Sequence, residues 1–218
     1  MKTVSLTIDG KKVTANAGDK LLRVALDNGI YIPNLCALRD ALEPAASCRL
    51  CFVKIESRKQ LVTACTEEIT EGMVVDTRGA LSLVRTGFEL LMASHPVDCA
   101  RCTKNLTCEL QKIAHHLGAS LKPRRLRRLM RELPVDDSSP LFIYDPNKCV
   151  LCERCVWVCR HRVGAGTLGF AHRGFDRIVT TFCDEPIGVD CQECAECVAV
   201  CPTGALAFKN KGQALTCP

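Results

Sequence analysis

The chain has 218 residues, a formal net charge of +5 and 17 cysteines. Cysteine thus makes up roughly 8 % of the chain, far above ordinary usage. The apolar fraction of 47 % includes these cysteines, and aromatic residues contribute only 5 %. A secreted disulfide scaffold is not expected, because the cysteine number is odd, C-x2-C pairs recur and no apolar secretory segment opens the chain. No stretch reaches the roughly 18 apolar residues of a membrane span. We expect a cytoplasmic protein with no membrane span, whose clustered thiols bind metal.

The first 78 residues have the pattern of a small α+β unit. Residues 4–8 and 13–15 alternate in polarity around Asp9-Gly10, which predicts a hairpin. Apolar spacing predicts a helix over residues 20–28, and Gly29 stands where such a helix would stop. Further short strands are predicted at 52–55, 61–64 and 73–76.

The pattern becomes helical from Ala80, and a second helix is predicted around residues 108–117. A basic run then extends from Lys122 to Arg131, followed by a stretch of linker composition. Leucines alternate with the arginines and no stacking aromatics accompany them, so we expect a solvated or docking helix and no nucleic acid as partner. The predicted domains are 1–78, 79–118 and 141–218, with the basic segment and linker at 119–140.

The last domain carries the pattern C-x2-C-x2-C-x3-C twice, repeated after 42 residues. In ferredoxins with two clusters, the fourth cysteine of each run ligates the other cluster. A pair of structural zinc sites is the alternative, but this doubled spacing is unusual for zinc. We therefore expect two [4Fe-4S] clusters, one held by Cys149, Cys152, Cys155 and Cys201, and the other by Cys159, Cys191, Cys194 and Cys197.

Two more groups of candidate ligands precede this domain. Their members are Cys36, Cys48, Cys51 and Cys65, spaced C-x11-C-x2-C-x13-C, and His95, Cys99, Cys102 and Cys108, spaced H-x3-C-x2-C-x5-C. Four thiolates suit a [2Fe-2S] cluster, although the first spacing differs from the plant-type ferredoxin pattern. Zinc remains an alternative for the first group. Cys183 and Cys217 have no partner at ligand spacing.

These groups, in this order, resemble the N-terminal part of the large iron-sulfur subunit of complex I and of iron-only hydrogenases. The resemblance is closest to the stand-alone diaphorase iron-sulfur subunit of NAD-reducing hydrogenases and to similar subunits of NAD(P)-linked formate dehydrogenases. It implies an α+β chain with a β-grasp [2Fe-2S] domain, a helical [4Fe-4S] segment with one histidine and three cysteine ligands, and a two-[4Fe-4S] bacterial ferredoxin-like domain. Its ligands would be the groups given above, including His95. Relatives usually have glycine in the loop before Cys48 and two residues before Cys108, where this chain has Ala45-Ala46-Ser47 and Leu106.

The resemblance implies an electron-transfer subunit with no catalytic residues of its own, working in anaerobic metabolism. Its expected partners are a flavoprotein NAD(P)(H)-binding subunit, a small [2Fe-2S] subunit, a catalytic hydrogenase or formate dehydrogenase subunit, and ferredoxin. A freely diffusing polyferredoxin is one alternative, and a zinc-bound scaffold or redox sensor is another. The sequence Gly164-Ala165-Gly166-Thr167-Leu168-Gly169 fits a dinucleotide motif, but it lacks the preceding strand that such a site needs.

Overall fold

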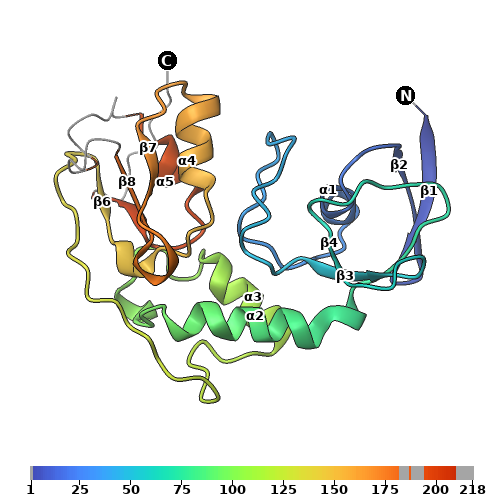
Figure 1. The fold of residues 1–218 in the computed structure, drawn as a ribbon, viewed down its shortest axis with the longest axis horizontal. Helices are drawn as coiled ribbons and strands as arrows, with labels where there is room; N and C mark the ends of the chain where they lie inside the picture. Colours follow the sequence, from blue (N-terminus) through green and yellow to red (C-terminus); the bar gives the residue numbers. More distant parts are fainter. Residues whose placement is uncertain (1, 182–186, 188–193, 210–218) are drawn as a thin grey trace. The chain divides into compact units, whose positions relative to one another are not determined.

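The computed structural model describes residues 2–181, 187 and 194–209 (Figure 1). These residues form two compact units, one from residues 1–90 with 113–119 and the other from residues 91–112 with 120–218. The segment predicted as a middle domain, 79–118, is therefore divided between the two units. Three cysteines lie outside the described residues. They are the predicted ligand Cys191 and the two cysteines without an assigned role, Cys183 and Cys217.

A five-stranded sheet forms the frame of the first unit, with strand order β2-β1-β5-β3-β4. Its strands are β1 (Thr3–Ile8), β2 (Lys11–Asn16), β3 (Phe52–Ile55), β4 (Val62–Thr63) and β5 (Val74–Asp76). The predicted hairpin is confirmed, because β1 and β2 pair antiparallel around Asp9 and Gly10, both at positive φ. β5 pairs parallel to β1, so the sheet brings distant parts of the chain together.

Helix α1 (Leu21–Asp27) supplies the apolar face that covers this sheet. Leu21, Leu22, Val24 and Ala25 are buried in one core with residues of the strands. Gly29 follows the helix at φ +74°, a conformation that favours glycine at a helix end. The sheet and α1 thus anchor both ends of the long loop that carries the first candidate ligands.

The two helices predicted after residue 80 are confirmed as α2 (Leu81–Ala93) and α3 (Glu109–Leu117). The helix expected in the basic run is wrong, since residues 119–140 contain no helix. The segment is held instead by tertiary hydrogen bonds, because Leu129 N–H donates to the Ala93 carbonyl and Arg128 donates to the His95 carbonyl. Pairing of this kind satisfies the backbone without the local bonds of a helix.

The second unit contains two small antiparallel sheets, each of two strands. β6 (Phe142–Tyr144) pairs with β9 (Leu206–Phe208), and β7 (Leu168–Ala171) pairs with β8 (Ile178–Thr181). Its helical elements are α4 (Arg154–Trp157), a π turn (Val158–Arg162) and α5 (Glu196–Val200), with short 3-10 turns at Cys99–Arg101, Pro146–Lys148 and Gly174–Asp176. A further 3-10 turn, Arg78–Ala80, leads into α2 in the first unit. Across the described ranges, no helix is long and apolar enough to cross a bilayer.

Candidate iron-sulfur sites

The first unit brings together the four cysteines predicted to hold the [2Fe-2S] cluster. Cys36 and Cys48 lie on the loop after α1, Cys51 directly precedes β3, and Cys65 follows β4. The sulfur atoms of Cys36 and Cys48 are 3.4 Å apart, and all four side chains are at most 7 % exposed. Hairpin and loop thus deliver four thiols to one buried place.

The protonation of these thiols shows how closely they are grouped. Hydrogen bonding to Cys36 raises the pKa of Cys48, and hydrogen bonding to Cys36 and Cys51 raises the pKa of Cys65. Accepting these bonds lowers the pKa of Cys36 and Cys51. The raised pKa of Cys48 and of Cys65 opposes their ionisation, which ligation of iron by thiolates requires. Among the described residues, no three His, Cys, Asp or Glu are arranged to hold a single metal ion.

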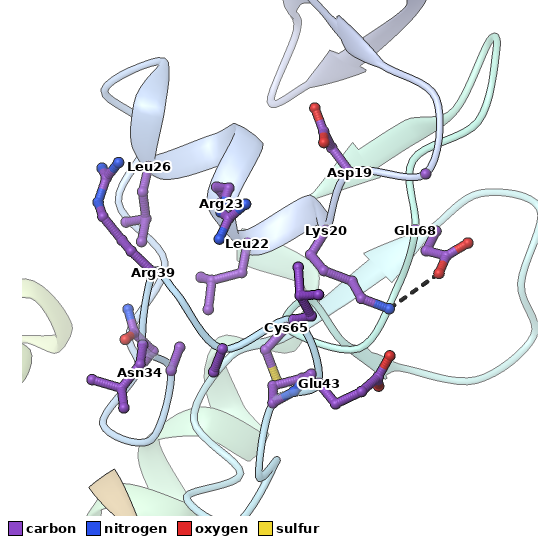
Figure 2. A pocket seen from close by; sticks show the side chains of 16 residues that line it. Asp19, Lys20, Leu22, Arg23, Leu26, Asn34, Arg39, Glu43, Cys65 and Glu68 are labelled. Atoms are coloured by element: carbon purple, nitrogen blue, oxygen red, sulfur yellow. Dashed lines mark hydrogen bonds and ion pairs between the residues drawn. The ribbon is translucent and has the colours of Figure 1, made fainter. Parts of the chain in front are cut away.

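A cavity of about 310 Å³ lies beside this cysteine group (Figure 2). Its wall includes Cys65, residues of α1 such as Leu22 and Arg23, and the loop after α1. An ion pair of 3.1 Å between Lys20 and Glu68 is part of its lining. The cavity leads from the surface of this unit towards one of the predicted ligands.

In the second unit, Cys99, Cys102 and Cys108 lie near one another around the 3-10 turn before α3. The Cys102 N–H donates to the Cys99 carbonyl over 3.1 Å. Burial raises the pKa of the Cys108 thiol, and the charges of Cys102 and Cys99 act in the same direction. Three of the four residues predicted for this site are thus close enough to interact.

His95 has the properties of an imidazole ligand. Burial lowers its pKa to about 4, and the positive charges of Lys148 and Arg128 contribute to the shift while Asp145 opposes it. The ring is therefore neutral near pH 7 and has a lone pair to offer a metal. Its Nδ1 atom is buried and has no hydrogen-bond partner among the described residues. These features fit iron, and ligation by His95 stays a prediction.

The first cysteine run of the last domain curls because its backbone enters the left-handed region. Leu151 has φ +53° and Glu153 has φ +71°, and α4 begins directly afterwards. Ala195, 42 residues after Glu153, has φ +55° and directly precedes α5. The internal repeat found in the sequence is therefore also a repeat of backbone conformation.

One cavity is lined by Cys149, Cys152, Cys155 and Cys201 together, as predicted for a single cluster. Burial raises the pKa of all three thiols of the run, to about 12 for Cys152. The Leu151 N–H donates to the sulfur of Cys149 over 3.4 Å, the kind of contact that stabilises a thiolate. The four donors and the curled loop fit a [4Fe-4S] cluster.

The second set is described in part, since Cys191 lies outside the described residues. Cys159 is on the π turn and Cys197 is on α5, and both belong to the same buried core. Cys159 Sγ lies 3.2 Å from the Thr167 hydroxyl. Cys194 is half-buried just before α5.

A short turn, Cys201–Ala205, connects two of the predicted sites. The Glu109 N–H, next to Cys108, donates to the Pro202 carbonyl, next to Cys201, over 3.0 Å. A Cβ atom on Gly204 would lie only 2.7 Å from Cys102 Sγ. Sequence reasoning missed Gly204, and also Tyr144, which lines the cavity of the four cysteines. A glycine three residues after a ligand was visible in the sequence, but the atom it avoids was not.

Comparison with known proteins gives three family matches in chain order. The chain matches a 2Fe-2S iron-sulfur cluster binding domain over residues 1–79 and the NADH-ubiquinone oxidoreductase-G iron-sulfur binding region over residues 85–121. It matches the ferredoxin-like domain of NADH-quinone oxidoreductase subunit 3 over residues 139–207. The chain therefore has one 2Fe-2S domain and 4Fe-4S binding domains.

Individual relatives agree with these matches. The HndD subunit of the NADP-reducing hydrogenase of Solidesulfovibrio fructosivorans is 37 % identical, over 94 % of this chain and 36 % of the relative. The gamma subunit of the NAD-reducing hydrogenase HoxS of Cupriavidus necator is 29 % identical, over 96 % of this chain and 89 % of the relative. A solved chain of an NAD+-reducing [NiFe]-hydrogenase in the H2-reduced state superposes with a TM-score of 0.85 at 28 % identity, covering 98 % of this chain and 90 % of that one.

The chain is similar to these hydrogenase subunits over nearly its whole length, and its three family matches are all to iron-sulfur domains. The expected resemblance to them is thereby confirmed, as is the α+β class with 2Fe-2S and 4Fe-4S ferredoxin-like domains. Several relatives are much longer than this chain. It spans about a third or less of the length of the hydrogenase subunit HndD and of the NADPH and NADH oxidoreductase subunits that it matches.

The two departures from the family sequence pattern fall on left-handed backbone. Ala46, in the loop before Cys48, has φ +48°, and Leu106, before Cys108, has φ +69° with a side chain 91 % exposed. Glycine adopts this conformation without strain, whereas alanine and leucine do so at a cost. The loops therefore keep a conformation that suits glycine although glycine is absent.

We predict that Gly204→Ala disturbs the site expected at Cys102, because the new methyl group would lie only 2.7 Å from its sulfur, closer than van der Waals contact allows. The expected result is loss or distortion of the electron paramagnetic resonance signal of one [4Fe-4S] cluster. Gly87→Ala is the matched control, since a Cβ there meets its nearest atom at 3.5 Å, an ordinary contact. An unchanged spectrum of the Gly204→Ala protein would show that Cys102 can move freely and is not held by iron.

Proposed function

We propose that the chain is an electron-transfer subunit that carries electrons one at a time between other redox subunits. One end of the route would be a flavoprotein NAD(P)(H)-binding subunit, with a small [2Fe-2S] subunit beside it. The other end would be a catalytic subunit of hydrogenase or formate dehydrogenase type, or ferredoxin. The observation that carries this proposal is the succession of iron-sulfur domains along nearly the whole chain, together with its similarity to 89 % of a hydrogenase subunit of Cupriavidus necator.

We also propose that the chain holds one [2Fe-2S] cluster and three [4Fe-4S] clusters. Its proposed domains are residues 1–78, 79–118 and 141–218, and we propose that the complex is cytoplasmic. When bound, these clusters accept and release single electrons without a change in the protein's covalent structure. The proposed ligands are the first group, Cys36, Cys48, Cys51 and Cys65; the histidine group, His95, Cys99, Cys102 and Cys108; the third group, Cys149, Cys152, Cys155 and Cys201; and the fourth group, Cys159, Cys191, Cys194 and Cys197.

The residues around each site would set how readily it takes up an electron. A histidine in place of a cysteine removes one negative charge, and charge alone should raise the reduction potential. Arg128 donates to the His95 carbonyl over 3.2 Å, and Lys148 acts on the same ring while paired with Asp145 at 2.9 Å. The basic run would therefore place positive charge beside the histidine site rather than bind nucleic acid.

Iron content tests the cluster assignment directly. Protein prepared without oxygen should contain about 14 iron atoms per chain, the sum for one [2Fe-2S] and three [4Fe-4S] clusters. Metal analysis that finds about four zinc atoms and little iron per chain would instead support the alternative of a zinc-bound scaffold or redox sensor. Purification at native abundance should yield a stable flavoprotein companion, whereas recovery of the chain alone would support a freely diffusing polyferredoxin.

Replacing the histidine tests its role as a ligand. His95→Cys should make the midpoint potential of one [4Fe-4S] cluster more negative, because a thiolate adds negative charge, and should change the electron paramagnetic resonance signal of that cluster. The other clusters should keep their midpoints, as measured by stepwise reduction and electron paramagnetic resonance. His115→Cys is a matched control at an exposed position of α3. If no [4Fe-4S] signal moves in the His95→Cys protein, His95 is not a ligand.

A further inference from the structure

Tyr144 places a buried hydroxyl beside the third group of cysteines. Its side chain is 5 % exposed, and the hydroxyl oxygen is buried without a hydrogen bond among the described residues. The residue ends β6, where its N–H and carbonyl both pair with Asp136 and its strand partner is Leu206. The ring is therefore fixed in place by the backbone on both sides.

The surroundings of the hydroxyl offer sulfur as its natural acceptor. Tyr144 lines the same cavity as Cys149, Cys152, Cys155 and Cys201. The hydroxyl lies close enough to Cys149 to interact with its thiol, and the backbone of Val179 is near the hydroxyl oxygen. Buried hydroxyls are normally hydrogen-bonded, and a thiolate at Cys149 would give the Tyr144 hydroxyl an acceptor.

We propose that Tyr144 donates a hydrogen bond to the Cys149 sulfur when this cysteine ligates iron, and so raises the reduction potential of that cluster. The inference rests on the proposed function for the ligand set, and it adds a residue that is not itself a ligand. The proton stays on the tyrosine oxygen, and only an electron enters or leaves the site.

The direction of the effect follows from charge. Reduction adds negative charge to the cluster and its thiolates, so a donor aimed at a ligand sulfur stabilises the reduced form more than the oxidised form. Hydrogen bonds to the sulfurs and burial are two of the factors that tune iron-sulfur potentials. Tyr144 would provide both, since it is itself buried and lines the cavity.

Tyr144→Phe in the complete, iron-loaded protein or its complex tests the inference, because only the hydroxyl is removed. The midpoint of one [4Fe-4S] cluster should become more negative by roughly 59 mV, which is a tenfold change in the one-electron equilibrium. The affected signal should differ from the one that His95→Cys moves. Tyr31→Phe, the same change at the chain's other tyrosine, should leave the midpoint potential of every [4Fe-4S] cluster unchanged.

A spectroscopic readout separates hydrogen bonding from general loosening of the core. Electron-nuclear double resonance after exchange into D2O should show an exchangeable deuteron coupled to this cluster, and Tyr144→Phe should abolish that coupling. An unchanged midpoint, or a coupling that persists in the variant, would overturn the inference. Iron content near that of the wild type must accompany either result. Wild-type protein without [4Fe-4S] signals would instead contradict the proposed function.

Discussion

The cores of both units bury sulfur side chains among apolar ones, and the sheets, helices and loops hold these sulfur atoms in place. In the first unit, Cys51 and Cys65 belong to the same core as the residues of α1 and the sheet. In the second unit, Cys155, Cys159 and Cys201 pack with Phe142 and Leu206. Burial opposes ionisation of a thiol, and iron bound here, as proposed, would supply the positive charge that buried thiolates need.

Curled loops make such cores possible. A run with two residues between successive cysteines can surround a compact cofactor only if its backbone turns repeatedly, and residues at positive φ produce that turn. Glu153 and Ala195 adopt it at equivalent places in the repeat although neither is glycine. Strain of this kind persists where surrounding structure and function require the conformation.

Local patterns in the sequence predicted most of the fold. The hairpin around Asp9-Gly10, the strand at 52–55 and the helices after residue 80 were predicted because turn chemistry and apolar periodicity are local properties. The basic run was predicted wrongly as helix, since its Arg128 and Leu129 bond to residues more than thirty positions away. The prediction that Cys201 joins Cys149, far away in the sequence, rested instead on the pattern of ferredoxins with two clusters. Tyr144 and Gly204 could not be found in this way, because their importance lies in which sulfur atom each one meets in space.

The turn from Cys201 to Ala205 links two segments of the second unit that carry predicted ligands. Its Pro202 carbonyl is fixed by Glu109 and its Gly204 leaves room for Cys102, so neither predicted ligand can move without displacing the segment that carries the other. If iron binds at both places as proposed, its loss from one would bear on the other, because the same short turn contacts the segments that carry Cys102 and Cys108.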